Sequence, residues 1–169
     1  MVRTPHVAGQ FYEADPERLR RQIEGSFLHP LGPGALPEKG AARSERDIVA
    51  CISPHAGYMY SGPPAAHVYH ALSGQEPPSR VVILGPNHTG IGGVLSTSIE
   101  DWATPLGVAR VDREAVAALN IPVDEYAHRY EHSLEVQLPF LQYIYGDSFM
   151  FAPVIISATG PNGVGIEDR

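Results

Sequence analysis

The chain alternates short apolar runs with stretches rich in glycine and proline, which is typical of an α/β fold with many short loops. Apolar runs of this length predict strands. The predicted strands are residues 48–53, 80–84, 94–99, 108–111 and 149–156. Pro153 makes the last strand irregular, because proline cannot donate a backbone hydrogen bond.

Helices are predicted where apolar residues recur at helical spacing behind a capping residue. Asp15 is a good N-cap, and Pro16 suits the first helical position. The apolar stripe of this first helix is Leu19, Ile23 and Phe27. Further helices are predicted over residues 61–72, 112–119 and 130–144, with a turn at 102–107. Pro139 predicts a kink in the last helix, or a break near Leu138.

The order of these elements predicts a three-layer α/β/α fold with a mostly parallel sheet. A strand, a helix and a second strand follow one another over residues 48–84, and such a crossover makes the two strands parallel. We expect a single domain over residues 1–156, followed by an unstructured or divergent tail at 157–169. Residues 29–47 are polar and rich in glycine and proline, so we interpret them as a mobile loop.

Composition removes several classes of function. The net charge is -7, with 12 basic and 19 acidic residues and no basic cluster, which argues against nucleic-acid binding. No apolar run is long enough to span a membrane, and no signal-like segment opens the chain. Cys51 is the only cysteine, which suits a cytoplasmic protein. Its place within an apolar run predicts a buried side chain in a strand.

Two histidines in similar settings are the strongest candidates for chemistry. His55 follows the apolar run 48–53, and His88 follows the run 80–84; each comes shortly after a proline and before a glycine. If both strands lie in one parallel sheet, the two imidazoles emerge at the same edge, where open α/β sheets bind ligands. Two neutral imidazoles facing one crevice form a plausible half of a metal site.

Glu131 and His132 are the next candidates, as a base or a carboxylate ligand near the start of a predicted helix. His128 lies four residues before His132, a spacing that can also chelate a metal on a helix. Solvated side chains at a helix end are the alternative for all three. Tyr58 and Asn87 lie beside the two principal histidines and are candidates for lining a pocket, with loop packing and turn capping as their alternatives.

Several motifs in this order resemble the Memo family, which includes the B component of the AmmeMemoRadiSam system. The resemblance runs from about Arg3 to Ile156. Its anchors are residues 9–12 (Gly-Gln-Phe-Tyr), 53–58 (Ser-Pro-His-Ala-Gly-Tyr), 83–88 (Ile-Leu-Gly-Pro-Asn-His), 104–107 (Thr-Pro-Leu-Gly) and 131–139 (Glu-His-Ser-Leu-Glu-Val-Gln-Leu-Pro). It implies a fold similar to that of class III extradiol dioxygenases, whose iron is held by two histidines and a carboxylate.

The resemblance further implies a metal-type pocket for iron or copper, in which His55 and His88 match the two histidine positions. Family members are substantially longer, and their additional part supplies a segment with a further histidine and a late cysteine. Nothing in this chain matches either element. We therefore expect an incomplete sheet and a half-open pocket.

Three functions remain open at this stage. The first is redox or oxygenase-like chemistry at a non-haem metal, with a third ligand from Glu131, His132, solvent or the additional part of the longer family members. The second is a non-catalytic binding or adaptor protein that uses the same crevice for a small ligand, a peptide or a partner protein. The third is a metal-dependent hydrolase with Glu131 as base. No organic cofactor is predicted.

Overall fold

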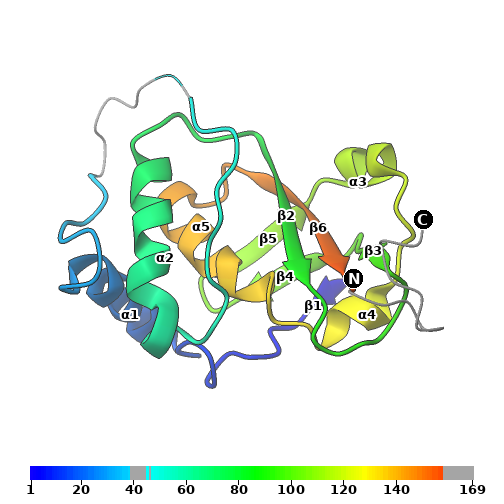
Figure 1. Ribbon diagram of the computed structural model, residues 1–169, viewed down its shortest axis with the longest axis horizontal. Helices are drawn as coiled ribbons and strands as arrows, with labels where there is room; N and C mark the ends of the chain where they lie inside the picture. The colour runs from blue at the N-terminus through cyan, green and yellow to red at the C-terminus, as the bar shows by residue number, and fades with distance from the viewer. Residues whose placement is uncertain (39–44, 46, 158–169) are drawn as a thin grey trace.

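The computed structural model describes residues 1–38, 45 and 47–157 as a mixed α/β structure with a six-stranded, mainly parallel sheet flanked by helices (Figure 1). The strands are β1 (Val2–Arg3), β2 (Arg80–Pro86), β3 (Leu95–Thr97), β4 (Asp101–Thr104), β5 (Gly107–Val111) and β6 (Met150–Ile156). The helices are α1 (Pro16–Leu28), α2 (Tyr58–Ser73), α3 (Arg113–Leu119), α4 (Glu125–Arg129) and α5 (Leu138–Tyr145), with a 3-10 turn η1 (Glu135–Gln137) before α5.

The sheet is built around β6 and ends at β2. Its order is β1-β4-β5-β6-β2, and β3 pairs with β6 off this path. The β1–β4, β5–β6 and β2–β6 pairs are parallel, whereas β3–β6 and β4–β5 are antiparallel. Helices α1, α2 and α5 pack together beside the sheet, while α3 and α4 lie on the opposite side of the view (Figure 1). The predicted α/β class is therefore confirmed.

Two helices begin where their capping residues predict. The Asp15 carboxylate accepts a hydrogen bond from the backbone N–H of Arg18 and starts α1. The apolar stripe of α1 is fully buried at Leu19, Ile23 and Phe27. In the same way, Asp112 accepts from the backbone N–H of Ala115 and starts α3.

The predicted first strand, residues 48–53, is wrong. These residues pair with no strand of the described structure, and the side chains of Val49 and Ile52 are almost fully exposed. Cys51, expected in the core, is also exposed. An apolar run becomes a strand only when another strand pairs with it, and here the sheet ends at β2.

The region expected to form one helix over 130–144 is divided. The chain turns after α4, forms η1, and enters α5 only at Leu138, so the predicted break is observed. Pro139 lies in the first turn of α5, where its missing N–H costs no hydrogen bond. The predicted turn at 102–107 is wrong in its first half, because Trp102 belongs to β4. Helix α2 begins at Tyr58, earlier than predicted, and its two prolines lie inside it.

A buried carboxylate attaches the N-terminal lead-in to the rest of the protein. Glu135 is inaccessible to solvent and forms an ion pair with Arg3, at 2.7 Å. It also accepts hydrogen bonds from the backbone N–H groups of His6 and Val7 and from the hydroxyl of Tyr12. A buried charge with this many donors is compensated, so the lead-in is held firmly although it is mostly irregular.

The described part of the predicted loop at 29–47 contains neither helix nor strand. Residues 39–44 and 46 of that loop, and residues 158–169 of the predicted tail, lie outside the described residues. Among the helices that are described, none combines the length and the apolar character needed to cross a membrane.

Buried His128 makes stability depend on pH. Burial lowers the pKa of His128 to about 4. Because the unfolded imidazole has a pKa near 6.5, the unfolded state binds a proton that the folded state does not bind between these two values. We predict that the free energy of unfolding is highest above about pH 6.5 and falls by up to about 3 kcal/mol through this group as the pH drops toward 4.

Urea unfolding of wild type and of His128→Leu at pH 7 and pH 4 tests this prediction. The variant should lose less unfolding free energy between the two pH values, because leucine does not titrate. The same substitution at exposed His29 is the control and should leave the pH dependence as in wild type. Equal pH dependence in wild type and His128→Leu would contradict the prediction.

Candidate metal centre

Three separate segments bring the candidate residues together at one end of the sheet. His88 is the second residue after β2, and His55 lies in the irregular segment before α2. Glu131 and His132 lie in the turn between α4 and η1. The strand β2 therefore positions His88 as predicted, whereas His55 arrives on a segment that is not a strand.

The three imidazole rings form a compact triangle. The ring centroids of His88 and His132 are 4.5 Å apart with nearly parallel planes, and those of His55 and His88 are 5.1 Å apart. The His55 and His132 centroids are 6.0 Å apart. The expected proximity of His55 and His88 is thus observed, and His132 joins them.

The buried carboxylate of Glu131 contacts the chain segments that carry His88 and His132. It is inaccessible to solvent, and one oxygen accepts hydrogen bonds from the backbone N–H groups of His132 and Ser133, both at 2.8 Å. The same oxygen lies 3.0 Å from Nδ1 of His88, and the other oxygen accepts from the backbone N–H of His88 at 2.5 Å. Glu131 therefore ties the loop after β2 to the turn that carries His132.

These contacts determine the charge of Glu131. Burial alone would raise its pKa, but hydrogen bonds from the His88 side chain and from the backbone of Ser133 and His88 outweigh burial and lower the pKa to about 2. The carboxylate is thus ionised at neutral pH and can only accept hydrogen bonds. It follows that Nδ1 of His88 carries a proton and donates it to Glu131. In the neutral form of this ring, Nε2 then has no hydrogen.

The other two rings favour the neutral form. Burial is the main cause that lowers the pKa of His55, and proximity to His88 lowers it further. Burial also lowers the pKa of His132, although the Glu131 charge acts in the opposite direction. Neutral imidazoles are the form that binds metal ions.

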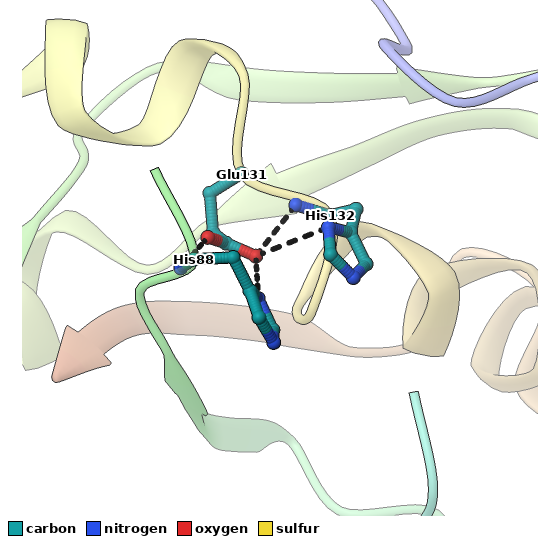
Figure 2. A group of neighbouring side chains, drawn as sticks. All are labelled: His88, Glu131 and His132. Atoms are coloured by element: carbon teal, nitrogen blue, oxygen red, sulfur yellow. Dashed lines mark hydrogen bonds and ion pairs between the residues drawn. The ribbon is translucent and has the colours of Figure 1, made fainter. Parts of the chain in front are cut away.

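Among the described residues, His88, Glu131 and His132 form a group that can hold a metal ion, with one ligand atom of each lying within 4.8 Å of the others. Figure 2 shows the rings of His88 and His132 extending to the same side, away from the carboxylate between them. His55 lies outside this tight group, but its ring is the third member of the triangle described above.

A shallow pocket of about 580 Å³ opens beside the histidines. Its walls include His55 and His132 together with the aromatic rings of Phe11 and Tyr60. The Phe11 ring centroid lies 4.7 Å from that of His132. Phe11 was not predicted as a pocket residue, although it lies within the lead-in motif at residues 9–12.

Other candidates have structural contacts. Tyr58 is buried, and its hydroxyl donates to the backbone carbonyl of Val136. The side chain of Asn87 accepts hydrogen bonds from Thr89 and donates to the carbonyl of Ile91, so it shapes the loop around His88. The structure does not bring His128 together with His132 as a chelating pair on one helix, because α4 ends before His132.

Gln137 was not identified from the sequence. Its side-chain amide donates to the carbonyl of Pro54, and its oxygen accepts from the hydroxyl of Tyr69. Gln137 thereby holds the segment that carries His55. A polar glutamine within the mostly apolar stretch 134–141 could have indicated a buried side chain with specific hydrogen-bond partners.

The chain is similar in sequence to a known protein family. The family model described as Memo-like protein matches residues 3–164. A MEMO1 family protein of Sulfolobus acidocaldarius is 53% identical over 172 residues, covering 96% of this chain and 60% of its own length. Another, from Ignicoccus hospitalis, is 51% identical over 168 residues and is covered over 59% of its length. The chain therefore spans about 60% of the length of these curated relatives.

Close packing behind the site generates a testable prediction. A Cβ atom added at Gly85 would lie 2.7 Å from Oγ of Ser133 and 3.2 Å from Leu134. Gly85→Ala should therefore push β2 away from the turn that carries His132. We expect a loss of about 1–3 kcal/mol in the free energy of unfolding, measured in urea, because overpacked sites cannot relax fully.

The matched control is Gly25→Ala in α1, where an added Cβ meets nothing within 4 Å. That variant should be as stable as wild type or gain up to about 1 kcal/mol from the better helix propensity of alanine. If Gly85→Ala were as stable as Gly25→Ala, the close contact between β2 and the turn would be refuted.

Proposed function

The chain belongs to the Memo-like protein family, and on this basis we propose that it binds a non-haem metal ion, iron or copper, between His55, His88 and His132. The observation that carries the proposal is the contact between Glu131 and His88. Histidine ligands of metals usually donate their second ring N–H to a carboxylate, which fixes the tautomer and the ring orientation. Glu131 supplies such an acceptor.

In this proposal Glu131 is a positioning residue. Both of its oxygens already accept hydrogen bonds, and its side chain is inaccessible to solvent. It directs Nε2 of His88 away from itself, toward the side on which the His132 ring also extends (Figure 2). Imidazole ligands suit iron and copper, and a site with few protein ligands leaves positions open for a further ligand.

The open pocket beside the histidines suits redox or oxygenase-like chemistry. A bound metal would supply Lewis acidity or electron transfer at this position. Phe11 and Tyr60 would contact an aromatic or apolar part of a substrate, because both line the pocket next to His55 and His132. We also propose a cytoplasmic location, because the chain has a single cysteine, and it is exposed.

A non-catalytic binding protein is the second candidate. Its support is the lining of the same pocket, in which Phe11, Pro54 and Ala56 accompany the two histidines. Such a surface suits a small apolar ligand or a peptide side chain. The third hypothesis, a hydrolase with Glu131 as base, has less support, because a carboxylate with a pKa of about 2 is a weak base.

Metal content of purified variants tests the proposal. Wild-type chain loaded with Fe(II) or Cu(II) and then desalted should retain about one ion per chain, measured by mass spectrometry, as expected for a single site. The double variant His55→Ala/His88→Ala should retain almost none. Glu131→Gln should bind about 10–100-fold more weakly, because it loses the carboxylate that orients His88.

The matched control is His67→Ala/His70→Ala, which removes the same number of histidines from α2. This control should bind as much metal as wild type. Equal metal content in wild type and in the folded His55→Ala/His88→Ala variant would contradict the proposed site.

A further inference from the structure

Three buried tyrosines donate hydrogen bonds to the three consecutive residues of η1, and the proposed metal site uses none of these contacts. Two of the tyrosines come from α2 and one from the N-terminal lead-in. The pairs are Tyr12 with the carboxylate of Glu135, Tyr58 with the backbone carbonyl of Val136, and Tyr69 with the side-chain oxygen of Gln137. Each phenol therefore has a fixed acceptor, as buried tyrosines usually do.

The rings of these tyrosines form a continuous series with Phe140 of α5. The centroids of Tyr12 and Tyr58 are 5.6 Å apart, and those of Tyr58 and Phe140 are 4.9 Å apart. Phe140 stacks on Tyr69, with centroids 4.7 Å apart. All three separations are those of direct ring contact. Because phenols are among the side chains that lose one electron most readily, this tyrosine series offers a path for electron transfer through the protein.

The tyrosine series begins beside the histidines. Tyr12 directly follows Phe11, whose ring centroid lies 4.7 Å from that of His132. A second connection runs through hydrogen bonds. The carbonyl of His132 accepts from the backbone N–H of Val136 at 3.1 Å, and the carbonyl of Val136 accepts from the hydroxyl of Tyr58. Both the rings and the hydrogen bonds therefore link the series to His132.

Tyr12 is the member of the series whose acceptor is a carboxylate. A phenol that has lost an electron becomes a strong acid, so its proton must pass to a nearby base. The carboxylate of Glu135, 2.7 Å from the hydroxyl, is a stronger base than the amide oxygens that face Tyr58 and Tyr69. Burial and the charge of Glu135 raise the pKa of Tyr12, so the phenol keeps its proton until it is oxidised.

We propose that Tyr12 is a redox-active tyrosine that serves the metal site. One electron passes from its ring to the oxidised metal ion, and the hydroxyl proton passes to Glu135. The products on the protein are a neutral tyrosyl radical and a neutral carboxyl group. The proposal rests on the proposed function for its oxidant, which is site-bound iron.

A peroxide is the co-reactant in this step. It takes two electrons from ferrous iron and, with two protons from solvent, becomes two molecules of water. The electron from Tyr12 then returns to the iron and leaves it ferric. Charge and atoms balance, and no further reductant is needed.

Tyr60 is the competing tyrosine, because it lines the histidine pocket itself. It is 79% exposed, and within the described part of the chain its hydroxyl donates to no residue, so a radical there would be open to solvent and short-lived. Tyr12 is only 2% exposed, and its proton has an acceptor in place. A long-lived radical therefore belongs on Tyr12.

A photo-oxidant attached to Cys51 tests the path without any metal. Cys51 is the only cysteine, is exposed, and lines the same hollow as Tyr69 at the far end of the series. A ruthenium(II) polypyridyl label on Cys51, illuminated with a cobalt(III) electron acceptor, becomes a one-electron oxidant. Labelled wild type should then give the EPR signal of a long-lived tyrosyl radical. Tyr12→Phe should lose almost all of that signal.

Tyr126→Phe is the matched control, since Tyr126 is exposed, lies outside the series and loses the same hydroxyl. It should give the wild-type signal. Tyr12→Phe should fold, because it keeps the ring and leaves Glu135 with its donors from Arg3, His6 and Val7. Circular dichroism and urea unfolding verify the fold of both variants.

A second experiment uses the metal. Wild-type chain that retains iron by mass spectrometry is treated with hydrogen peroxide and frozen for EPR. It should give the same tyrosyl signal as the ruthenium experiment, and iron-loaded Tyr12→Phe should not.

The outcomes separate the two proposals. The absence of a long-lived radical in labelled wild type overturns the role of Tyr12, and so does an equal signal in folded Tyr12→Phe or a signal that Tyr60→Phe abolishes. A chain that retains iron but gives no tyrosyl signal with peroxide overturns the link to the metal site. A chain that retains no iron contradicts the proposed function instead, and the ruthenium experiment still decides whether Tyr12 is redox-active.

Discussion

Two carboxylates buried without access to solvent, Glu131 and Glu135, hold together the end of the molecule that carries the candidate site. Burying a charge costs free energy unless hydrogen-bond donors surround it. Each carboxylate therefore accepts hydrogen bonds from several chain segments. Glu135 holds the N-terminal lead-in by accepting hydrogen bonds from Arg3 and Tyr12. Glu131 holds the loop after β2 through its contacts with the backbone N–H and Nδ1 of His88. The turn between them is therefore the point at which lead-in, sheet and histidines meet.

The local parts of the fold were predictable because local interactions determine them. The Asp15 and Asp112 caps define where two helices begin, and both are observed. Pro139 marks the start of α5 because a proline in the first turn of a helix removes no hydrogen bond. The segment at residues 48–53 was not predictable in this way, since strand formation depends on a pairing partner that no local pattern reveals.

The proximity of His55 and His88 was predictable from the sequence, but the predicted cause, that both follow strands of one sheet, holds only for His88. His88 does follow a strand of the sheet, but His55 does not. What brings His55 close is the hydrogen bond between Gln137 and the carbonyl of Pro54, a long-range contact. Likewise, sequence spacing identified Glu131 and His132 as candidates but could not assign them different roles. The roles that we propose for them rest on burial, because Glu131 is inaccessible to solvent while His132 lines the pocket.

We propose that the carboxylate of Glu131 holds a proton on Nδ1 of His88, so that Nε2 of the neutral ring is free to bind a metal. Long-range proton–nitrogen NMR of the histidine rings tests this most directly, because it distinguishes the two tautomers in solution. We expect the neutral His88 ring to be in the Nδ1–H form in wild type, and its Nε2 resonance should shift on addition of Zn²⁺. An Nε2–H tautomer at His88 in the folded, metal-free protein would contradict it.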